Sequence, residues 1–143
     1  MCYAVYIGTD VPCETSQWDE QDRKFYIEDL HERDMTVVQH FTKPHVYYAG
    51  SWQNCGCGFF SEPEWAEAED ELDEIQETER CITDLVAFLN RALETSNDVE
   101  LFVCWEGDQS KPPERKYRVR PKELLGQSLP LKELDFVVVT KEK

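Results

Sequence analysis

The chain has 143 residues, of which 41% are hydrophobic and 12% aromatic, and its formal net charge is −15. This composition excludes a disordered chain and predicts a single globular domain spanning residues 1–143, with a core that needs no disulfides. Because the charge is strongly negative and no apolar run approaches the roughly 18 residues that cross a bilayer, we expect neither nucleic acid nor a membrane as partner.

The first third of the chain is predicted to form strands. Cys2–Ile7 is apolar on both faces, which indicates a buried central strand. Phe25–Leu30 is a second expected strand, and the β-branched and aromatic residues of Thr36–Phe41 favour a third. Pro44 cannot donate a ladder hydrogen bond, so it should lie at the end or edge of the next strand, His45–Gly50.

A tight loop and one long helix are expected next. In the loop, Asn54–Gly58, alternating glycines permit backbone angles that are closed to other residues. Ser61 and Glu64 then fit a capping box. Apolar residues at steps of three and four predict a helix over about 62–95, on the order of 50 Å long, which favours a kink or break near 74–79. Its apolar face would hold Trp65, Ala68, Leu72, Ile75, Ile82, Val86, Leu89 and Leu93.

The last third returns to strands. Val99–Trp105 is apolar on both faces, Lys116–Arg120 alternates between basic and apolar residues, and Leu134–Thr140 is a final strand. At most a helical turn is expected over Pro121–Gly126. The predicted fold is therefore α+β, a mixed sheet of about five to seven strands with one long helix packed on it, whose continuity through residues 74–79 stays open. If the strands flanking the helix are parallel, the crossover should be right-handed.

The cysteines suggest a compartment and a candidate metal site. The first ten residues lack the basic and cleavage regions of a secretory signal, which predicts a cytoplasmic protein with reduced thiols. Cys55 and Cys57 could supply two thiolates, and His45 an imidazole, to a zinc ion that prefers four ligands. Their one-residue spacing differs from the usual zinc knuckle, and further ligands would have to arrive through the fold, from Cys2, Cys13, Cys81 or Cys104. The alternative, a glycine turn with cysteines buried as small hydrophobes, is favoured, so no cofactor is expected and zinc is the exception to test.

Cys2 is a candidate nucleophile. Removal of Met1 would leave a thiol beside its own α-amine, which could act as its base. The Met-Cys start resembles that of N-terminal-nucleophile amidotransferases, which implies a catalytic Cys2, but the chain has no Asn-Gly pair for an oxyanion hole. It is similar also to the Met-Cys-Gly start of abasic-site-binding proteins, although Tyr3 replaces the glycine. The favoured alternative is a core cysteine at the head of a central strand.

Two charged segments could bind partners. Residues 62–79 carry ten acids and no base, which would suit a protein with a basic surface, although solubility alone is the favoured explanation. Lys116, Arg118 and Arg120 share one face of their strand. They could bind an anionic ligand or pair with the acidic helix, and a solvated strand face is the simpler alternative.

Three motifs together resemble small uncharacterised bacterial proteins: the MCYAVYIGTD start, the HVYYAGS segment from His45 and the CGCGF loop from Cys55. The resemblance covers about the first 60 residues and implies no particular activity. We therefore expect a small binding or protein-interaction domain rather than an enzyme. The alternative is a cysteine-based site, either metal-binding at the CGCG loop or an N-terminal cysteine nucleophile of a hydrolase or amidotransferase-like enzyme. The oligomeric state stays open.

Overall fold

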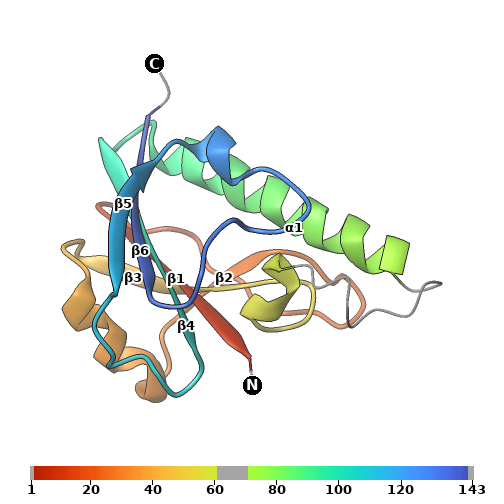
Figure 1. The fold of residues 1–143 in the computed structure, drawn as a ribbon, viewed down its shortest axis with the longest axis horizontal. Helices are drawn as coiled ribbons and strands as arrows, with labels where there is room; N and C mark the ends of the chain where they lie inside the picture. Colours follow the sequence, from red (N-terminus) through yellow and green to blue (C-terminus); the bar gives the residue numbers. More distant parts are fainter. Residues whose placement is uncertain (1, 61–70, 142–143) are drawn as a thin grey trace.

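The computed structural model describes residues 2–60 and 71–141 and shows an α+β fold, with one long helix packed on a six-stranded mixed sheet (Figure 1). The strands are β1 (Tyr3–Thr9), β2 (Tyr26–Asp29), β3 (His45–Gly50), β4 (Asp98–Trp105), β5 (Arg115–Val119) and β6 (Asp135–Thr140). The helices are α1 (Glu71–Ala92) and three short 3-10 helices, η1 (Glu32–His40), η2 (Gly56–Phe59) and η3 (Pro121–Leu124).

The strand order is β2-β3-β1-β4-β6-β5, so β1 and β4 are inner strands and β2 and β5 form the edges. Every pairing is antiparallel except that of β5 with β6. Because β3 and β4 are both antiparallel to β1, they run parallel to each other. The connection through α1 is therefore a crossover that passes β1, as expected for strands separated by a helix.

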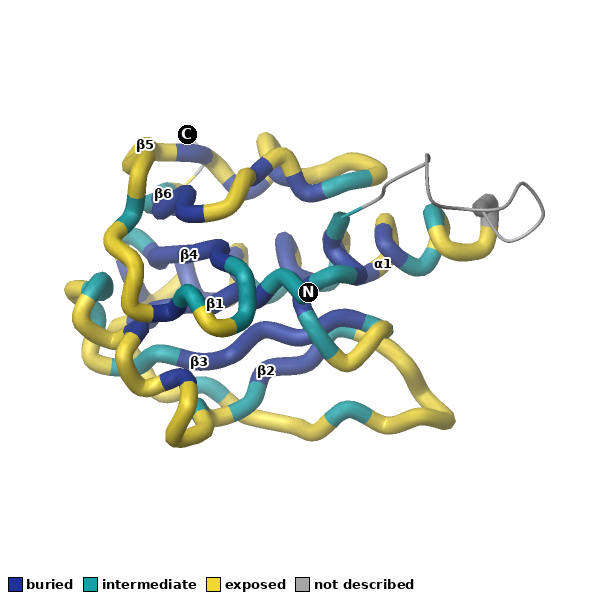
Figure 2. The backbone as a smooth tube through the Cα atoms, turned by 60° about the horizontal axis from the view of Figure 1, so that its bottom comes forward, coloured by how far each residue is buried: buried dark blue, intermediate teal, exposed yellow. Residues whose placement is uncertain are grey.

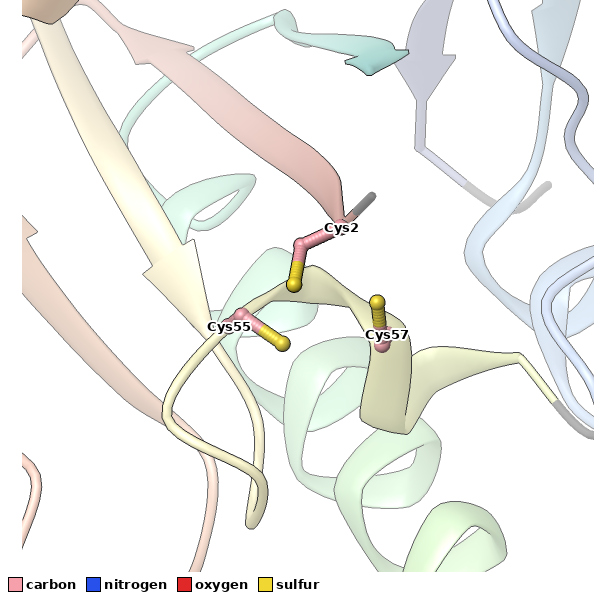
Figure 3. A group of neighbouring side chains, drawn as sticks. All are labelled: Cys2, Cys55 and Cys57. Carbon is pink, nitrogen blue, oxygen red and sulfur yellow. The ribbon is translucent and has the colours of Figure 1, made fainter. Parts of the chain in front are cut away.

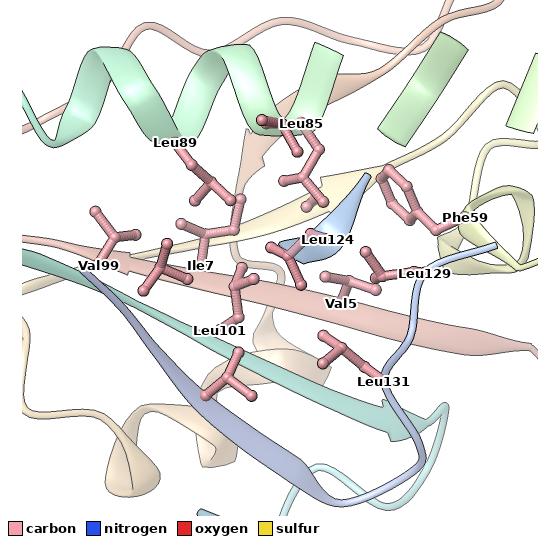
Figure 4. Close-up of a cluster of buried hydrophobic side chains, with 14 of the residues drawn as sticks. Val5, Ile7, Phe59, Leu85, Leu89, Val99, Leu101, Leu124, Leu129 and Leu131 are labelled. Carbon is pink, nitrogen blue, oxygen red and sulfur yellow. The ribbon is translucent and has the colours of Figure 1, made fainter. Parts of the chain in front are cut away.

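The larger core lies between the sheet and α1. Leu85 and Leu89 project from the helix onto Val5 and Ile7 of β1 and onto Leu101 of β4 (Figure 4). Side chains from η2 and from the segment after β5 close the ends of this layer: Phe59, Leu124, Leu129 and Leu131. The two central strands, β1 and β4, are buried along most of their length, which confirms the expectation for strands that are apolar on both faces.

The opposite face of the sheet is covered by η1 and by the loop after β4. Tyr6 of β1 donates a hydrogen bond to the buried carboxylate of Asp34 over 2.7 Å, and the Gln109 side chain donates to the Tyr6 hydroxyl oxygen over 3.2 Å. Val37 of η1 packs against the buried apolar residues on this face of the sheet. The sheet is thus buried on both sides at its centre, while its β5 edge is largely exposed (Figure 2).

The expected strand at Thr36–Phe41 is wrong, because these residues belong largely to η1. Asp34, in the first turn of η1, accepts a hydrogen bond from the backbone N–H of His31. Val37 is buried while Val38 is 39% exposed, so the β-branched pair contributes one core contact rather than the alternation of a strand. Tertiary contacts override the local preference here.

The helix α1 is continuous through residues 74–79, so the expected break there is wrong (Figure 1). The expected capping box at Ser61 and Glu64, and the helix start near residue 62, lie outside the described residues. No helix in the part that the structure describes is long and apolar enough to span a bilayer.

Candidate metal centre

The pairing of β1 with β3 brings the first cysteine of the chain to the CGCG loop. Val5 is opposite Ala49 in this antiparallel pair, so the start of β1 lies beside the end of β3. Cys2 immediately precedes β1, and the loop that carries Cys55 and Cys57 immediately follows β3. Two segments more than 50 residues apart in the sequence therefore meet at one end of the sheet.

The loop is held against the sheet by hydrogen bonds and close packing. The Ser51 backbone N–H and hydroxyl both donate to the carbonyl oxygen of Cys55, over 2.9 and 2.6 Å. A Cβ on Gly56 would lie 2.6 Å from the carbonyl oxygen of Tyr3, and one on Gly58 would lie 2.1 Å from the Ser51 hydroxyl oxygen. These distances are shorter than any ordinary contact, so the loop needs glycine at both positions.

The reason for the glycines differs from the expected one. The left-handed backbone conformation in this loop is adopted by Asn54, with φ 64°, and not by Gly56 or Gly58. Asn54 tolerates this conformation better than most residues. Its side chain accepts a hydrogen bond from the Tyr26 hydroxyl over 3.0 Å. The glycines provide close approach rather than unusual dihedral angles.

The sulfurs of Cys2, Cys55 and Cys57 all lie within 4.8 Å of one another (Figure 3). The side chains come from two segments, Cys2 from the residue before β1 and Cys55 and Cys57 from the loop after β3 that continues into η2, and they point toward a common space. The backbone N–H of Tyr3 donates a hydrogen bond to the Cys57 sulfur over 3.2 Å. All three residues are only partly buried, so the cluster is accessible from solvent.

The cluster favours one thiolate in its metal-free form. The pKa of Cys57 is lowered to about 6, chiefly because the Cys55 thiol donates a hydrogen bond to its sulfur. The Tyr3 amide acts in the same direction, while burial opposes it. The pKa of Cys55 is raised by the same hydrogen bond, and that of Cys2 is raised mainly by burial. The sulfurs therefore share a negative charge that a cation would stabilise.

The remaining cysteines are placed differently. Cys81, a residue of α1, is buried in the core between α1 and the sheet. Cys104 of β4 is buried in the core on the opposite face of the sheet. Burial raises the pKa of Cys81 to about 11 and that of Cys104 to about 12. The part-exposed Cys13 lies instead near the Thr9 hydroxyl, with its sulfur 3.7 Å from that oxygen. These three thiols lie outside the cluster formed by the described residues.

The structure does not bring His45 to the cysteines. His45 pairs with Thr9 at the far end of β1 from Cys2. Seven residues of extended chain span about 23 Å, which no metal coordination sphere bridges. Glu106 lies near the cluster, since its backbone N–H donates to the Cys2 carbonyl oxygen over 2.8 Å. The charge of Glu106 contributes to raising the pKa of Cys2.

Of the basic candidates, Lys116 and Arg118 lie on β5, at the edge of the sheet remote from β3, and Arg120 directly follows this strand. Arg120 forms an ion pair with Glu123 over 3.3 Å, and the Lys116 ammonium lies 5.4 Å from the centre of the Phe136 ring. Arg118 is exposed. No ion pair joins Lys116, Arg118 or Arg120 to an acid of α1 among the described residues, so neutralisation of the acidic helix is not seen there.

From the sequence, Cys55 and Cys57 were the main ligand candidates. Cys2 was expected chiefly as a nucleophile and was also one of four cysteines that could complete the metal site. The pairing of β1 with β3 is what joins them. If these strands pair antiparallel, the start of β1, next to Cys2, lies beside the end of β3, next to the CGCG loop. Comparison with known proteins adds no further guide: no family model, no curated protein and no solved structure matches this chain.

Proposed function

We propose that this protein binds a zinc ion through Cys2, Cys55 and Cys57. The observation that carries the proposal is the convergence within 4.8 Å of three thiol sulfurs, one from the residue before β1 and two from the loop after β3. Zinc–sulfur bonds of about 2.3 Å in a tetrahedron separate the sulfurs by roughly 3.8 Å. Small side-chain rotations would bring the cysteines to that spacing.

The chemistry of the site supports a soft, thiophilic cation. Thiolates select Zn²⁺, Cu⁺ or iron–sulfur clusters over hard cations such as Mg²⁺ or Ca²⁺. Metal binding would replace the thiol protons that the cysteines now share by hydrogen bonding. With three protein ligands and partial exposure, a fourth coordination position would remain for water or another ligand, as in sites that act on a substrate.

The surroundings favour a pre-organised site. The Tyr3 ring lies between two other aromatic rings. Its centre is 4.0 Å from that of Trp105, on which it stacks, and 4.3 Å from that of Phe60. This packing fixes the backbone directly after Cys2 and the residue directly after η2. The reducing cytoplasm that the sequence predicts would keep the three thiols available for metal.

The direct test is metal binding by the purified full-length chain under reducing conditions. We expect one Zn²⁺ per chain by elemental analysis after dialysis, and sulfur-to-metal charge-transfer absorption from three thiolates when Co²⁺ replaces zinc. Substituting a residue that hydrogen-bonds to a metal ligand typically lowers metal affinity about 10- to 100-fold. Loss of a ligand itself should have a larger effect, so Cys2→Ser, Cys55→Ser and Cys57→Ser should each lower zinc affinity more than about 100-fold.

The matched control is Cys13→Ser, which removes a part-exposed cysteine outside the cluster and should leave the affinity unchanged. Metal that binds equally well to all four variants would refute the site. A preference for Cu⁺ over Zn²⁺ in competition would refute the zinc assignment. A Co²⁺ spectrum typical of two thiolates would refute the three-cysteine ligand set. Rapid formation of a disulfide without metal binding would replace the proposal by a redox function.

A further inference from the structure

The outer edge of β5 is open. β5 is the last strand of the sheet and pairs only with β6 among the described strands. In the part of the chain that the structure describes, no backbone hydrogen bond from another segment reaches that outer edge. An edge of this kind exposes alternate N–H and C=O groups that can pair with an added strand.

The edge carries positive charge in a protein of net charge −15. Lys116 and Arg118 are exposed and lie two residues apart, so their side chains leave the same face of the strand about 6.7 Å from each other. Neither forms an ion pair with an acid in the described ranges. Among the described residues no acid neutralises either cation, although the Lys116 ammonium lies 5.4 Å from the centre of the Phe136 ring. Their neighbours Arg115 and Arg120 are paired with Asp135 and Glu123.

The other face of β5 carries Tyr117 and Val119, together with Arg115, whose charge is paired with Asp135. Val119 is buried in the core beneath α1, and Tyr117 is 38% exposed with its hydroxyl donating to Asp135 over 2.8 Å. A strand added beside β5 would therefore meet cations on one face and an aromatic ring on the other. Cross-strand neighbours lie about 5 Å apart, which is close enough for opposite charges to pair.

We propose that β5 docks an extended acidic peptide, which adds to the sheet as a seventh strand with acidic residues at alternate positions facing Lys116 and Arg118 and apolar residues facing Tyr117. The backbone edge would supply affinity and the alternating pattern would supply specificity. A second copy of β5 fits poorly, because it would place like charges opposite each other. The field of the whole protein opposes every anionic partner, nucleic acid included, and backbone pairing along the sheet edge is a favourable contribution that only a peptide can make.

The test measures binding of a labelled peptide, acetyl-Glu-Val-Glu-Val-Glu-amide, to the full-length protein by fluorescence anisotropy at physiological salt. A peptide of the same composition with its acids adjacent, Glu-Glu-Glu-Val-Val, should bind at least tenfold more weakly. The double variant Lys116→Gln with Arg118→Gln should lower the affinity for the alternating peptide at least tenfold. The control pair Lys24→Gln with Arg33→Gln changes the net charge equally at exposed sites elsewhere and should change the affinity less than twofold.

Backbone methylation separates strand addition from charge attraction. Only alternate amides of an added strand face the edge of the sheet. N-methylation of one alternate set should therefore abolish binding, and methylation of the other set should not. Equal binding of the two peptide patterns, equal effects of the two methylated sets, or tighter binding of a single-stranded oligonucleotide of the same charge would each overturn the proposal.

Discussion

Gly56 packs so closely on Tyr3 that a Cβ at position 56 would lie 2.6 Å from the Tyr3 carbonyl oxygen. This contact joins the start of β1 to the short helix η2 and places Cys57 where it accepts a hydrogen bond from the Tyr3 amide. The geometry of the cysteine cluster therefore depends on the absence of a side chain at a residue that is not itself a ligand.

Substitution Gly56→Ala should push η2 away from β1. Backbone cannot rotate aside as a flexible side chain can, so we expect a loss of about 1–3 kcal/mol in the free energy of unfolding. Zinc affinity should fall as well, because Cys57 moves away from Cys2. Urea unfolding and Co²⁺ titration measure the two effects. Ser110→Ala, at an exposed site, is the control and should stay within about 0.5 kcal/mol. An unchanged midpoint and affinity would mean that the loop accommodates a methyl group without moving.

In the metal-free protein, Cys57 should be the first cysteine to react with iodoacetamide. Its pKa of about 6 leaves it mainly as thiolate at pH 7, and its rate should fall about tenfold per pH unit below pH 6. Cys81 and Cys104 should react only after unfolding, because they are buried and their pKa values are raised to about 11 and 12. Mass spectrometry of digested protein identifies the modified residue, and added Zn²⁺ should protect Cys57. Equal rates for all cysteines would contradict this order.

The buried carboxylate of Asp34 should be a main anchor of η1. It accepts hydrogen bonds from the Tyr6 hydroxyl over 2.7 Å and from the His31 amide over 3.2 Å. Asp34→Ala should cost about 1–3 kcal/mol, because it removes the acceptor for buried donors. A double-mutant cycle with Tyr6→Phe should give a coupling of at least about 0.5 kcal/mol in urea unfolding. Additive effects would show that the pair is not energetically linked, and Asp22→Ala on the surface serves as control.

Asp135 should stabilise the fold in a pH-dependent manner. Burial alone would raise the pKa of its carboxyl, but hydrogen bonds from the Lys132 amide, Arg115 and Tyr117 outweigh burial and lower it. A lowered pKa contributes stability that is present above the unfolded value of about 3.9 and is lost as the pH falls through the folded value.

Substitution Asp135→Asn should therefore cost about 1–3 kcal/mol at pH 7, and the difference from the parent chain should shrink below about pH 4. Urea midpoints at pH 7 and pH 3 provide the comparison. Asp73→Asn, at an exposed position of α1, should show no such pH dependence. A difference that stays constant between the two pH values would assign the effect to packing instead of charge.

Much of the sheet is predictable from local patterns. The bounds of β3, His45–Gly50, coincide with the expected strand, since Pro44 and Gly50 flank an apolar-aromatic run. β1 and β4 were expected as buried strands because both of their faces are apolar, and burial on both sides of the sheet confirms this. Of the apolar stripe expected for the long helix, Ile82, Val86, Leu89 and Leu93 are buried in the core between helix and sheet, which confirms that part of the prediction. Its first residues, Trp65, Ala68 and Leu72, lie outside the side chains that the structure describes.

Two local interpretations failed where a distant contact decides the outcome. The β-branched residues of Thr36–Phe41 suggested a strand, yet the hydrogen bond of Asp34 to Tyr6 of β1 holds η1 over the sheet. Gly56 and Gly58 suggested unusual backbone angles, yet their need for glycine comes from Tyr3 and Ser51. Neither partner is visible in a window of neighbouring residues.

The fold class, the main strands and the helix face can be read from local patterns, because they follow from hydrophobic period and from residues that favour or stop regular structure. Which thiols meet depends instead on how distant strands pair. Sequence spacing constrains the distance in space between two residues only when they are a few positions apart. Cys2 precedes Cys55 by more than 50 residues, so their spacing alone does not predict that they meet. The antiparallel register of β1 with β3 brings these two cysteines together, and the same register carries His45 to the opposite end of the strand.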